Sequence, residues 1–417
     1  MLLGAWQLVA LIGGLSVLSL MIIYPNLALV AMVATIPLSR LAIDTGFFTV
    51  TPHMVVTLAA VAAIFLGAAH GKRPLRYTPV LVTIALFLLF AFVPTFVSTD
   101  PFLSLRRWLN LSYLAMAFWA TYQLIPDRRC LLRALHSLLW TVLLVSLFGL
   151  VQVISWRLGR PVDGLVFPLI GSSTWIRAES TFADPNMLGG FLIVTLPLIA
   201  YWWNGSSAVE LDAPRLWLAL VLVFGVGALA VTFSRGALLG LAVAFALFGI
   251  RHKRDLWLLV VGIVALAFFI PAPLLKRLMT ALTLQDFSSM ERLRLWAEGL
   301  AKLGQSPVIG WGLNMFPIVV GAGDTIRAAH NVLVELAVET GLLGLVTFLT
   351  TALLYLASTL RALRQAPPSV TPLLQGSLIG LAAVFVQNLT IGGLYQPYLW
   401  CSLALSLALP KVMVNHG

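Results

Sequence analysis

Long apolar stretches alternate with short polar loops along nearly the whole chain. A helix needs about 20 apolar residues to cross a hydrocarbon core of about 30 Å, and stretches of that size recur from residue 52 onwards. They lie near 52–69, 79–97, 108–125, 131–155, 185–203, 215–233, 237–251, 256–274, 340–360, 372–389 and 396–412. The pattern predicts an all-α polytopic membrane protein.

The N-terminal apolar stretch leaves the number of crossings open. Residues 3–38 are long for one crossing, and Tyr24-Pro25-Asn26 has the composition of a turn. Two crossings give about 13 transmembrane helices, whereas one kinked crossing or a re-entrant hairpin gives about 12. The stretch lacks the charged start and the small-residue cleavage site of a signal peptide, so we expect it to remain in the mature protein.

Composition agrees with a membrane protein. The 417 residues are 60% hydrophobic and only 10% charged, with a mean hydropathy of +0.99, whereas a soluble domain is about half apolar and about a quarter charged. The formal net charge of +11 is compatible with nucleic-acid binding, but the basic residues are dispersed among short loops, as determinants of topology are. We therefore expect membrane lipids, and no nucleic acid, around the chain.

Basic loops orient the helices, because lysine and arginine collect in cytoplasmic loops. Four short basic groups are assigned to the cytoplasm: Lys72, Arg73 and Arg76; Arg128, Arg129 and Arg133; Arg251, His252, Lys253 and Arg254; Arg361 and Arg364. The outer face then carries residues 98–107, 156–184, 234–236 and 275–330. Cys130 and Cys401 are expected beside apolar stretches on the cytoplasmic side, which supports neither a disulfide framework nor a thiolate metal site.

The longest polar stretch, residues 275–330, is too long to be a simple connection, because ordinary connections have about 2–8 residues. We interpret it as a small periplasmic domain that carries the chemistry, between transmembrane parts at 1–274 and 331–417. Within it, Met290 to Lys302 has the apolar spacing of a helix, and Ser306 to Gly312 has the composition of a turn.

An unusual set of arginines maps to the outer face, against the rule that positive charge collects inside. The set is Arg40, Arg106, Arg107, Arg157, Arg160, Arg177, Arg235, Arg292, Arg294 and Arg327. Arginine suits phosphate because its planar fork forms two parallel charge-assisted hydrogen bonds and keeps its proton. The pattern indicates an anionic ligand held at the membrane surface.

Three of these arginines are candidate ligands of a diphosphate, and each has a simpler alternative. Arg235 stands between two helices with almost no loop, where it would alternatively be a snorkelling arginine that caps a helix hairpin. Arg177 precedes an Asp-Pro-Asn turn and alternatively pairs with Glu179 or Asp184. Arg292 alternatively forms a surface salt bridge with Glu291 or Glu298.

His330 is the candidate catalytic residue. It ends the polar stretch, directly before Asn331 and a helix that carries Glu335 and Glu339. Histidine titrates near neutral pH, so it can take a proton from a sugar hydroxyl in the transition state. Asn331 and Glu339 are candidates for orienting the ring or stabilising its protonated form, as is Glu335. The alternative is a packed or solvated histidine at a helix start.

No cofactor is expected from the sequence. The outer face has no His-x-x-x-His, paired-carboxylate or Asp-x-Asp pattern, which argues against a metal site. There is no phosphate-binding Gly-rich motif after a strand, so nucleotide use is not indicated.

Four segments in order resemble the O-antigen ligase and polymerase superfamily of bacterial inner membranes. The segment from Arg177 to Asn186 resembles its R-a-x-G-x-F-x-N-P-N run, and Ser234-Arg235-Gly236 its SRG junction. Arg292 to Gly312 resembles R-L-x-x-W followed by P-x-x-G-x-G, and His330 to Gly344 resembles H-N-x-x-L followed by E-x-G-x-x-G. The chain departs from the family at Ser180 and Asp184, where glycine and asparagine are frequent.

The resemblance implies a metal-independent, inverting glycosyltransferase on the periplasmic face of the inner membrane. It would move a glycan from undecaprenyl diphosphate to a sugar hydroxyl of lipid A–core. His330 would act as general base, and Arg177, Arg235 and Arg292 would bind the diphosphate. A polymerase of the same superfamily shares these residues and differs in its acceptor. A protein glycosyltransferase is disfavoured by the absence of a soluble domain after Lys411. A lipid or solute transporter is the non-enzyme alternative, disfavoured because charge concentrates at one surface rather than near the bilayer midplane.

Overall fold

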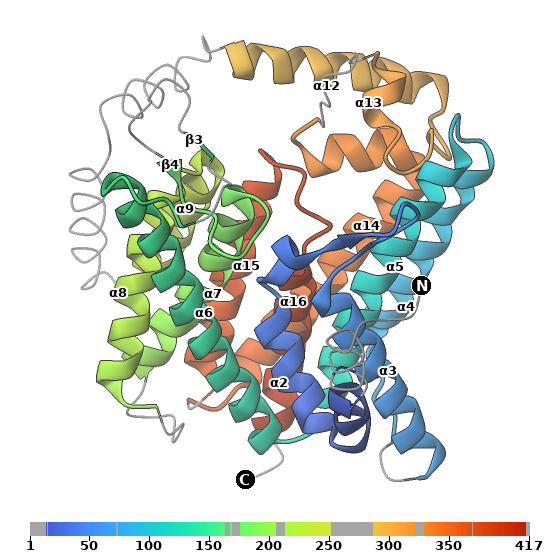
Figure 1. The fold of residues 1–417 in the computed structure, drawn as a ribbon. Helices are drawn as coiled ribbons and strands as arrows, with labels where there is room; N and C mark the ends of the chain where they lie inside the picture. The colour runs from blue at the N-terminus through green and yellow to red at the C-terminus, as the bar shows by residue number, and fades with distance from the viewer. Residues whose placement is uncertain are drawn as a thin grey trace, which may run out of the picture.

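The structure is a bundle of helices with one further helix lying across its upper end (Figure 1). This computed structural model describes residues 14, 16–71, 74–162, 167–168, 176–205, 213–251, 287–321, 329–368 and 370–413. Among them, five helices are long and apolar enough to cross a membrane, and four shorter apolar helices accompany them. The predicted all-α polytopic membrane fold is confirmed. The predicted crossing at 256–274 lies outside the described residues, so the number of crossings stays a prediction.

The N-terminal helical segment is interrupted at Tyr24. Residues 16–23 are helical, and a new helix begins at Pro25, where proline suits the first turn of a helix because its missing N–H would have no partner there. Thr51 then caps the third helix by accepting a hydrogen bond from the Met54 N–H. The order is α2 (Pro25–Thr35), η1 (Leu38–Leu41), the antiparallel pair β1 (Ile43–Asp44) and β2 (Thr49–Val50), and α3 (Pro52–Ala69).

Aspartate caps fix where the next two long helices begin. Asp100 accepts a hydrogen bond from the Leu103 N–H and Asp127 accepts one from the Cys130 N–H. Both caps satisfy donors that have no partner within their helix. The elements are α4 (Pro79–Phe92), η2 (Val93–Phe96), α5 (Pro101–Leu124) and α6 (Arg128–Arg157).

Helix α7 lies at the centre of the bundle, with 78% of its apolar window buried. It packs closely on α15, because a side chain at Gly380 would overlap the Val194 carbonyl group. Small residues allow such close backbone approach between membrane helices. The elements of this region are β3 (Phe167–Pro168), β4 (Ile176–Arg177), α7 (Pro185–Gly205), α8 (Arg215–Val231), α9 (Arg235–Arg251) and α15 (Thr371–Asn388).

A second, smaller hydrophobic core lies outside the main one. Leu295, Phe316, Ala329 and Val338 are buried together there. They come from α12 (Phe287–Gln305), α13 (Phe316–Val319), the residue before His330 and the first turns of α14 (Val332–Gln365). The predicted helix and turn of this region are present, but residues 275–286 lie outside the described part, so the boundaries 1–274, 275–330 and 331–417 stay a prediction.

The connections between helices lie at two ends of the bundle (Figure 1). In Figure 1 the starts of α5, α9 and α14 lie at the α12 end, whereas the ends of α3 and α5 lie at the opposite end. Near the start of α16 (Pro397–Met413), Cys401 lies with Sγ 3.7 Å from Nε2 of His53, at the start of α3, and 3.6 Å from Oγ1 of Thr121, near the end of α5. The expected cytoplasmic placement of Cys130 and Cys401 therefore stays a prediction.

Candidate active site at one end of the bundle

Arg177 is tied directly to the junction between α8 and α9. Its Nε donates a hydrogen bond to the carbonyl oxygen of Thr232 at 2.9 Å, and Nη2 donates to Oδ1 of Asn186 at 2.9 Å. Oγ of Ser234 donates to the same Asn186 oxygen at 2.9 Å. Since Ser234 precedes Arg235, the structure brings the two predicted phosphate-binding arginines into one place, which we call the arginine half of the site.

The α8–α9 junction turns within three residues. Phe233 adopts φ 50°, a left-handed conformation that is uncommon for a bulky residue and tends to mark turns and functional sites. Arg235 begins α9 immediately afterwards. Next to it, a Cβ at Gly236 would lie 2.5 Å from the hydroxyl oxygen of Thr390. The glycine of the Ser-Arg-Gly sequence is therefore required by the close approach of the α15–α16 loop.

His330 lies between the outer helix and the start of α14, in what we call the histidine half. It adopts φ 52° and is half-buried. The residue before it, Ala329, is fully buried and accepts a hydrogen bond from Nε1 of Trp296 at 2.7 Å. The residue after it, Asn331, caps α14 by accepting hydrogen bonds from the N–H groups of Leu333 and Val334. The side-chain oxygen of Asn331 is thus engaged in starting the helix.

The environment of His330 favours its neutral form. Burial lowers the pKa of His330 below its ordinary value, and the nearby positive charge of Arg292 lowers it further. Arg292 of α12 therefore lies within electrostatic range of the histidine. A neutral imidazole has a free nitrogen lone pair, which is the state that a general base needs.

Glu335 lies beside the backbone at His330. The N–H groups of Ala329 and His330 lie near its carboxyl group and stabilise its charged form. Arg107 of α5 lies within electrostatic range of this carboxylate, and its guanidinium carbon lies 3.4 Å from the ring centroid of Tyr395. The buried Glu339 accepts a hydrogen bond from the Phe316 N–H at 3.3 Å. Both carboxylates thus lie near backbone N–H groups around His330.

The turn at residues 307–312 is hydrogen-bonded to α14 at a kink in that helix. Helix α14 is broken at Gly341, which has φ 62° and ψ −168°. The N–H groups of Leu342 and Leu343 donate to the carbonyl groups of Pro307 and Val308, while the carbonyl groups of Val338 and Glu339 accept from Trp311 and Gly312. The turn therefore replaces the hydrogen bonds that the kink removes from α14.

The loop between α15 and α16 joins the two halves. At one end Thr390 meets Gly236 of α9, and further along a Cβ at Gly392 would lie 2.6 Å from Oε2 of Glu335. Sequence reasoning missed this loop. The sequence feature that marks this loop is Tyr395-Gln396, an aromatic and a polar residue that follow Gly392-Gly393 between two apolar helices.

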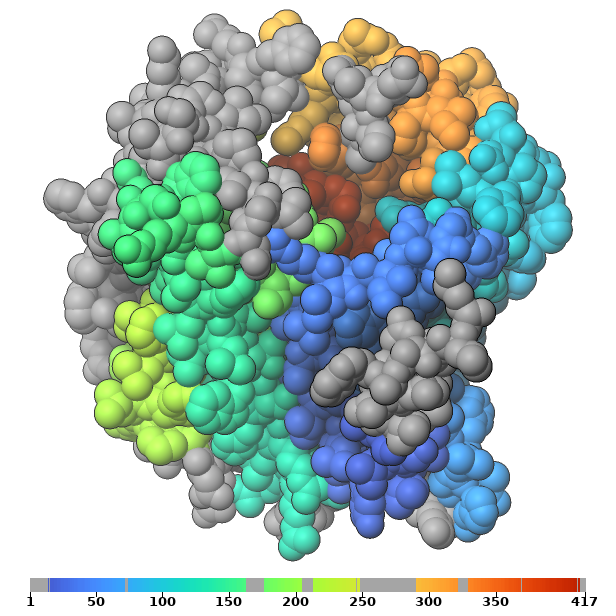
Figure 2. All heavy atoms as spheres, viewed as in Figure 1, coloured from blue at the N-terminus to red at the C-terminus, as the bar shows by residue number. Residues whose placement is uncertain are grey.

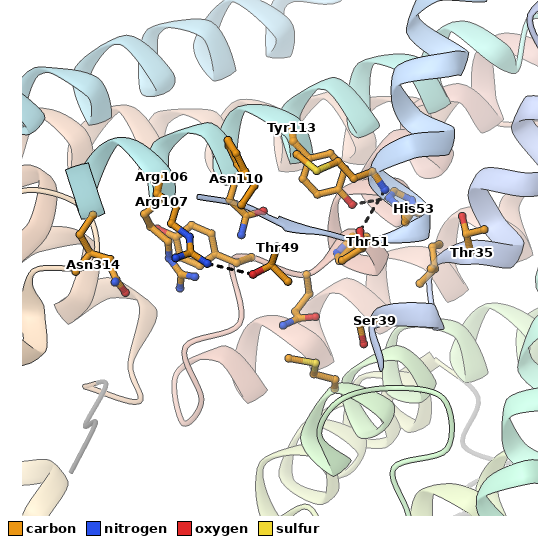
Figure 3. A pocket seen from close by; sticks show the side chains of 18 residues that line it. Thr35, Ser39, Thr49, Thr51, His53, Arg106, Arg107, Asn110, Tyr113 and Asn314 are labelled. Atoms are coloured by element: carbon orange, nitrogen blue, oxygen red, sulfur yellow. Dashed lines mark hydrogen bonds between the residues drawn. The ribbon is translucent and has the colours of Figure 1, made fainter. Parts of the chain in front are cut away.

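A cavity of 430 Å³ opens beside the two halves. Figure 2 shows it as a hollow between the N-terminal segment in blue, the α7 region in green and the α12–α14 region in orange. Residues from α5 and the α15–α16 loop complete its wall (Figure 3). The lining residues include Ser39, Thr49, Arg106, Arg107, Asn110, Met187, Asn314, Tyr395 and Gln396.

Other predicted outer arginines have different partners. Arg40 pairs with Glu179 at 2.9 Å, and Arg294, rather than Arg292, forms the i,i+4 pair with Glu298 at 2.8 Å. Burial raises the pKa of Glu179 above its ordinary value, while Arg40 opposes that shift. Arg327 lies outside the described residues. Within the described part of the chain, no three His, Cys, Asp or Glu side chains gather as they would around a metal ion.

One family model matches part of the chain. A comparison with curated proteins finds no match. Residues 219–349 match the family model described as O-Antigen ligase. This region contains Arg235, Arg292 and His330, the residues that the structure places around the α12 end of the bundle. This match over residues 219–349, together with the apolar helices of the bundle, supports membership of the O-antigen ligase superfamily.

Proposed function

We propose that the protein is an inner-membrane ligase that transfers an O-antigen glycan from undecaprenyl diphosphate to a sugar hydroxyl of lipid A–core. The active site is the α12 end of the bundle, and it faces the periplasm. His330 is the general base, and Arg177, Arg235 and Arg292 bind the diphosphate without a metal ion. The family match supports a ligase or polymerase reaction, and the donor, acceptor and residue roles are our proposal.

The observation that carries the proposal is the continuous contact path between the two halves. Asn186 links Arg177 to Ser234, Gly236 meets the α15–α16 loop, and the same loop meets Glu335. Glu335 in turn lies near the backbone N–H of His330. This path supports a proposal in which a phosphate-binding group and a neutral base act together, as a transfer from a diphosphate to a hydroxyl requires.

The reaction that this geometry supports is a single displacement. The neutral imidazole of His330 accepts the proton of the acceptor hydroxyl as its oxygen attacks the anomeric carbon of the donor. The bond from that carbon to the diphosphate oxygen breaks on the opposite face, so the anomeric configuration inverts. Arginine donors stabilise the charge that develops on the leaving diphosphate, and the imidazolium then releases its proton to solvent.

Reconstitution tests the proposed reaction. Purified protein is incubated with the undecaprenyl-diphosphate-linked glycan and lipid A–core in EDTA, and the products are separated by mass. We expect lipid A–core that carries the glycan, with inverted anomeric configuration by NMR. Longer lipid-linked glycans without modified lipid A–core would instead identify a polymerase. Donor uptake into sealed vesicles without any transfer would identify a transporter.

Cysteine labelling tests the orientation. The native Cys130 and Cys401 are both buried, so single cysteines introduced on the surface report their own exposure. Gln305 is exposed at the end of α12, and His70 is exposed at the opposite end of the bundle. A membrane-impermeant maleimide added to the periplasm should label Gln305→Cys and leave His70→Cys unlabelled. The reverse result removes the periplasmic site.

A further inference from the structure

The cavity beside the two halves has polar groups left over for a ligand. The side-chain amides of Asn110, Asn314 and Gln396 line it and form no hydrogen bond within the described part of the chain. In Figure 3, Asn110 and Asn314 reach the same space from α5 and from the turn after Trp311. Each amide offers two donors and one acceptor. A ligand with several groups that both donate and accept matches this lining.

Two hydroxyl groups of the cavity each accept a hydrogen bond from the protein. Oγ of Ser39 accepts a hydrogen bond from the Ala183 N–H. Oγ1 of Thr49 accepts one from Arg106 at 3.2 Å. The hydroxyl group of Tyr395, which is buried without a hydrogen-bond partner among the described residues, adds to the binding capacity of the three amides.

The charges of the cavity favour an uncharged ligand over a phosphate. Arg106 is engaged with Thr49 and also lies 3.7 Å from a carboxylate oxygen of Asp44. Arg107 stacks on Tyr395 and attracts the carboxylate of Glu335, although its Nε is buried without a hydrogen-bond partner among the described residues. Both cations thus have nearby counter-charges, which weakens their attraction for a further anion.

The aromatic side chains give the cavity apolar surfaces beside the amides. Phe48, Tyr113 and Tyr395 line it together with Leu103 and Met187. A sugar ring has apolar C–H faces and an edge of hydroxyl groups that donate and accept. Few polar groups converging in a mostly apolar pocket of this size are typical of small-ligand sites. Amides and aromatic rings, with an acidic side chain near each of the two arginines, therefore fit a neutral sugar.

The cavity touches both halves of the site. Met187 follows Asn186, the residue that binds Arg177 and Ser234. On the other side, Arg107 lines the cavity and lies within electrostatic range of Glu335, which lies near the backbone N–H of His330. The cavity wall therefore contains a residue that adjoins each half of the site.

We propose that this cavity is the subsite for the acceptor sugar, in which Asn110, Asn314 and Gln396 bind its hydroxyl groups. The inference rests on the proposed transferase function, because it takes His330 to be the base on the acceptor hydroxyl. It assigns the neutral sugar to the cavity and leaves the diphosphate to the arginine half.

Two amide truncations test the subsite. Asn110→Ala and Gln396→Ala each remove one cavity amide, while Asn314 is left intact because its φ of 64° suits asparagine better than alanine. Asn204→Ala is the matched control, since Asn204 is exposed at the opposite end of α7. Loss of an amide contact should raise the acceptor KM roughly tenfold. The turnover number and the donor KM should stay within about twofold of wild type.

The outcomes separate the two substrates. A rise in the donor KM with an unchanged acceptor KM would overturn the assignment and give the cavity to the donor glycan. Unchanged values for both substrates in folded variants would show that the cavity is no sugar site. Thermal unfolding and size-exclusion chromatography establish that each variant is folded.

A binding measurement keeps the subsite test independent of the proposed reaction. Fluorescent lipid A–core is titrated onto the full-length protein in detergent, without any donor. Binding that weakens in Asn110→Ala and Gln396→Ala but persists in Asn204→Ala supports the subsite even if no transfer is detected. Transfer by the wild type with equal binding by all three variants would leave the ligase function standing and refute the subsite.

Discussion

The arginine half and the histidine half of the site are built in different ways. Arg177, Asn186 and Ser234 come from one continuous region, and their side chains bond directly to one another or to the α8–α9 junction. His330 instead depends on α12 and α14, which flank it in the chain, and on α5 and the α15–α16 loop, which are distant from it in sequence. The arginine half belongs to the helix bundle, whereas the histidine half is positioned by the outer layer docked onto it.

This difference suggests a division of labour. In the proposed reaction, the group that binds diphosphate is positioned before the donor arrives, and the hydrogen bonds of the arginine half favour this. A general base contributes only when an acceptor is present, so its position can depend on an outer layer that both substrates approach. Removing either half should therefore give a different kinetic defect.

Replacing the histidine should produce the largest effect. His330→Ala removes the base, so we expect turnover to fall by about 10²–10⁴-fold with little change in donor affinity. Single-turnover kinetics and donor-binding titrations separate the two. His70→Ala, at the exposed opposite end of the bundle, is the control and should keep full activity. A folded His330→Ala protein that transfers at the wild-type rate would leave only the phosphate site.

Changing an arginine of the other half should weaken donor use. Arg235→Lys keeps the charge but loses the two-pronged fork, so donor kcat/KM should fall roughly ten- to a hundredfold. Arg215→Lys, on the exposed start of α8, is the matched control. Arg177→Lys should additionally lower the melting temperature, because Arg177 also ties Asn186 to Thr232. Normal donor use by folded Arg235→Lys would reduce Arg235 to a hairpin cap.

The hydrogen bonds between the turn at residues 307–312 and the kink of α14 at Gly341 should stabilise the histidine half. Gly341→Ala places a Cβ against the Val308 carbonyl group, in a backbone region that only glycine adopts readily. We expect it to lower the free energy of unfolding by about 1–3 kcal/mol, measured by thermal unfolding in detergent. Gly304→Ala is the control, because no atom lies within 4 Å of a Cβ there. Equal melting temperatures would show that the kink needs no glycine.

The sequence predicted the helices and the residues of both halves but not how the halves meet. Apolar stretches are set by bilayer thickness, so α3 to α9 and α14 to α16 appear close to where the hydropathy pattern puts them. The link through Gly236, Thr390, Gly392 and Glu335 joins residues more than 150 positions apart in places, and no local pattern encodes it. Capping by Asn331 follows from its place before a helix, yet adjacency to His330 had suggested a role on the ring.

Ser180, a departure from the family pattern, also depends on a contact that no local sequence pattern predicts. Ser180 stands where the family often has glycine, and it keeps the left-handed conformation with φ 58°. The Gln152 side chain accepts a hydrogen bond from the Ser180 N–H and donates one to its carbonyl oxygen, at 2.8 and 3.3 Å. The glycine is therefore replaced by a contact from α6, which is 28 residues earlier in the chain.

The smallest expected effect is a shift in the pH midpoint of transfer, which tests whether Arg292 acts on His330 or on the donor. Because burial and then the Arg292 charge lower the pKa of His330, the neutral, active form should predominate already below the ordinary value of about 6.5. Transfer should rise with pH through that lowered midpoint and then level off. Arg292→Gln removes the weaker of the two causes, so its midpoint should move upward while remaining below the ordinary value. Arg294→Gln on the same helix, where Arg294 instead pairs with Glu298, should leave the midpoint in place. If Arg292→Gln and wild type share one midpoint, Arg292 acts on the donor phosphates alone and not on the base.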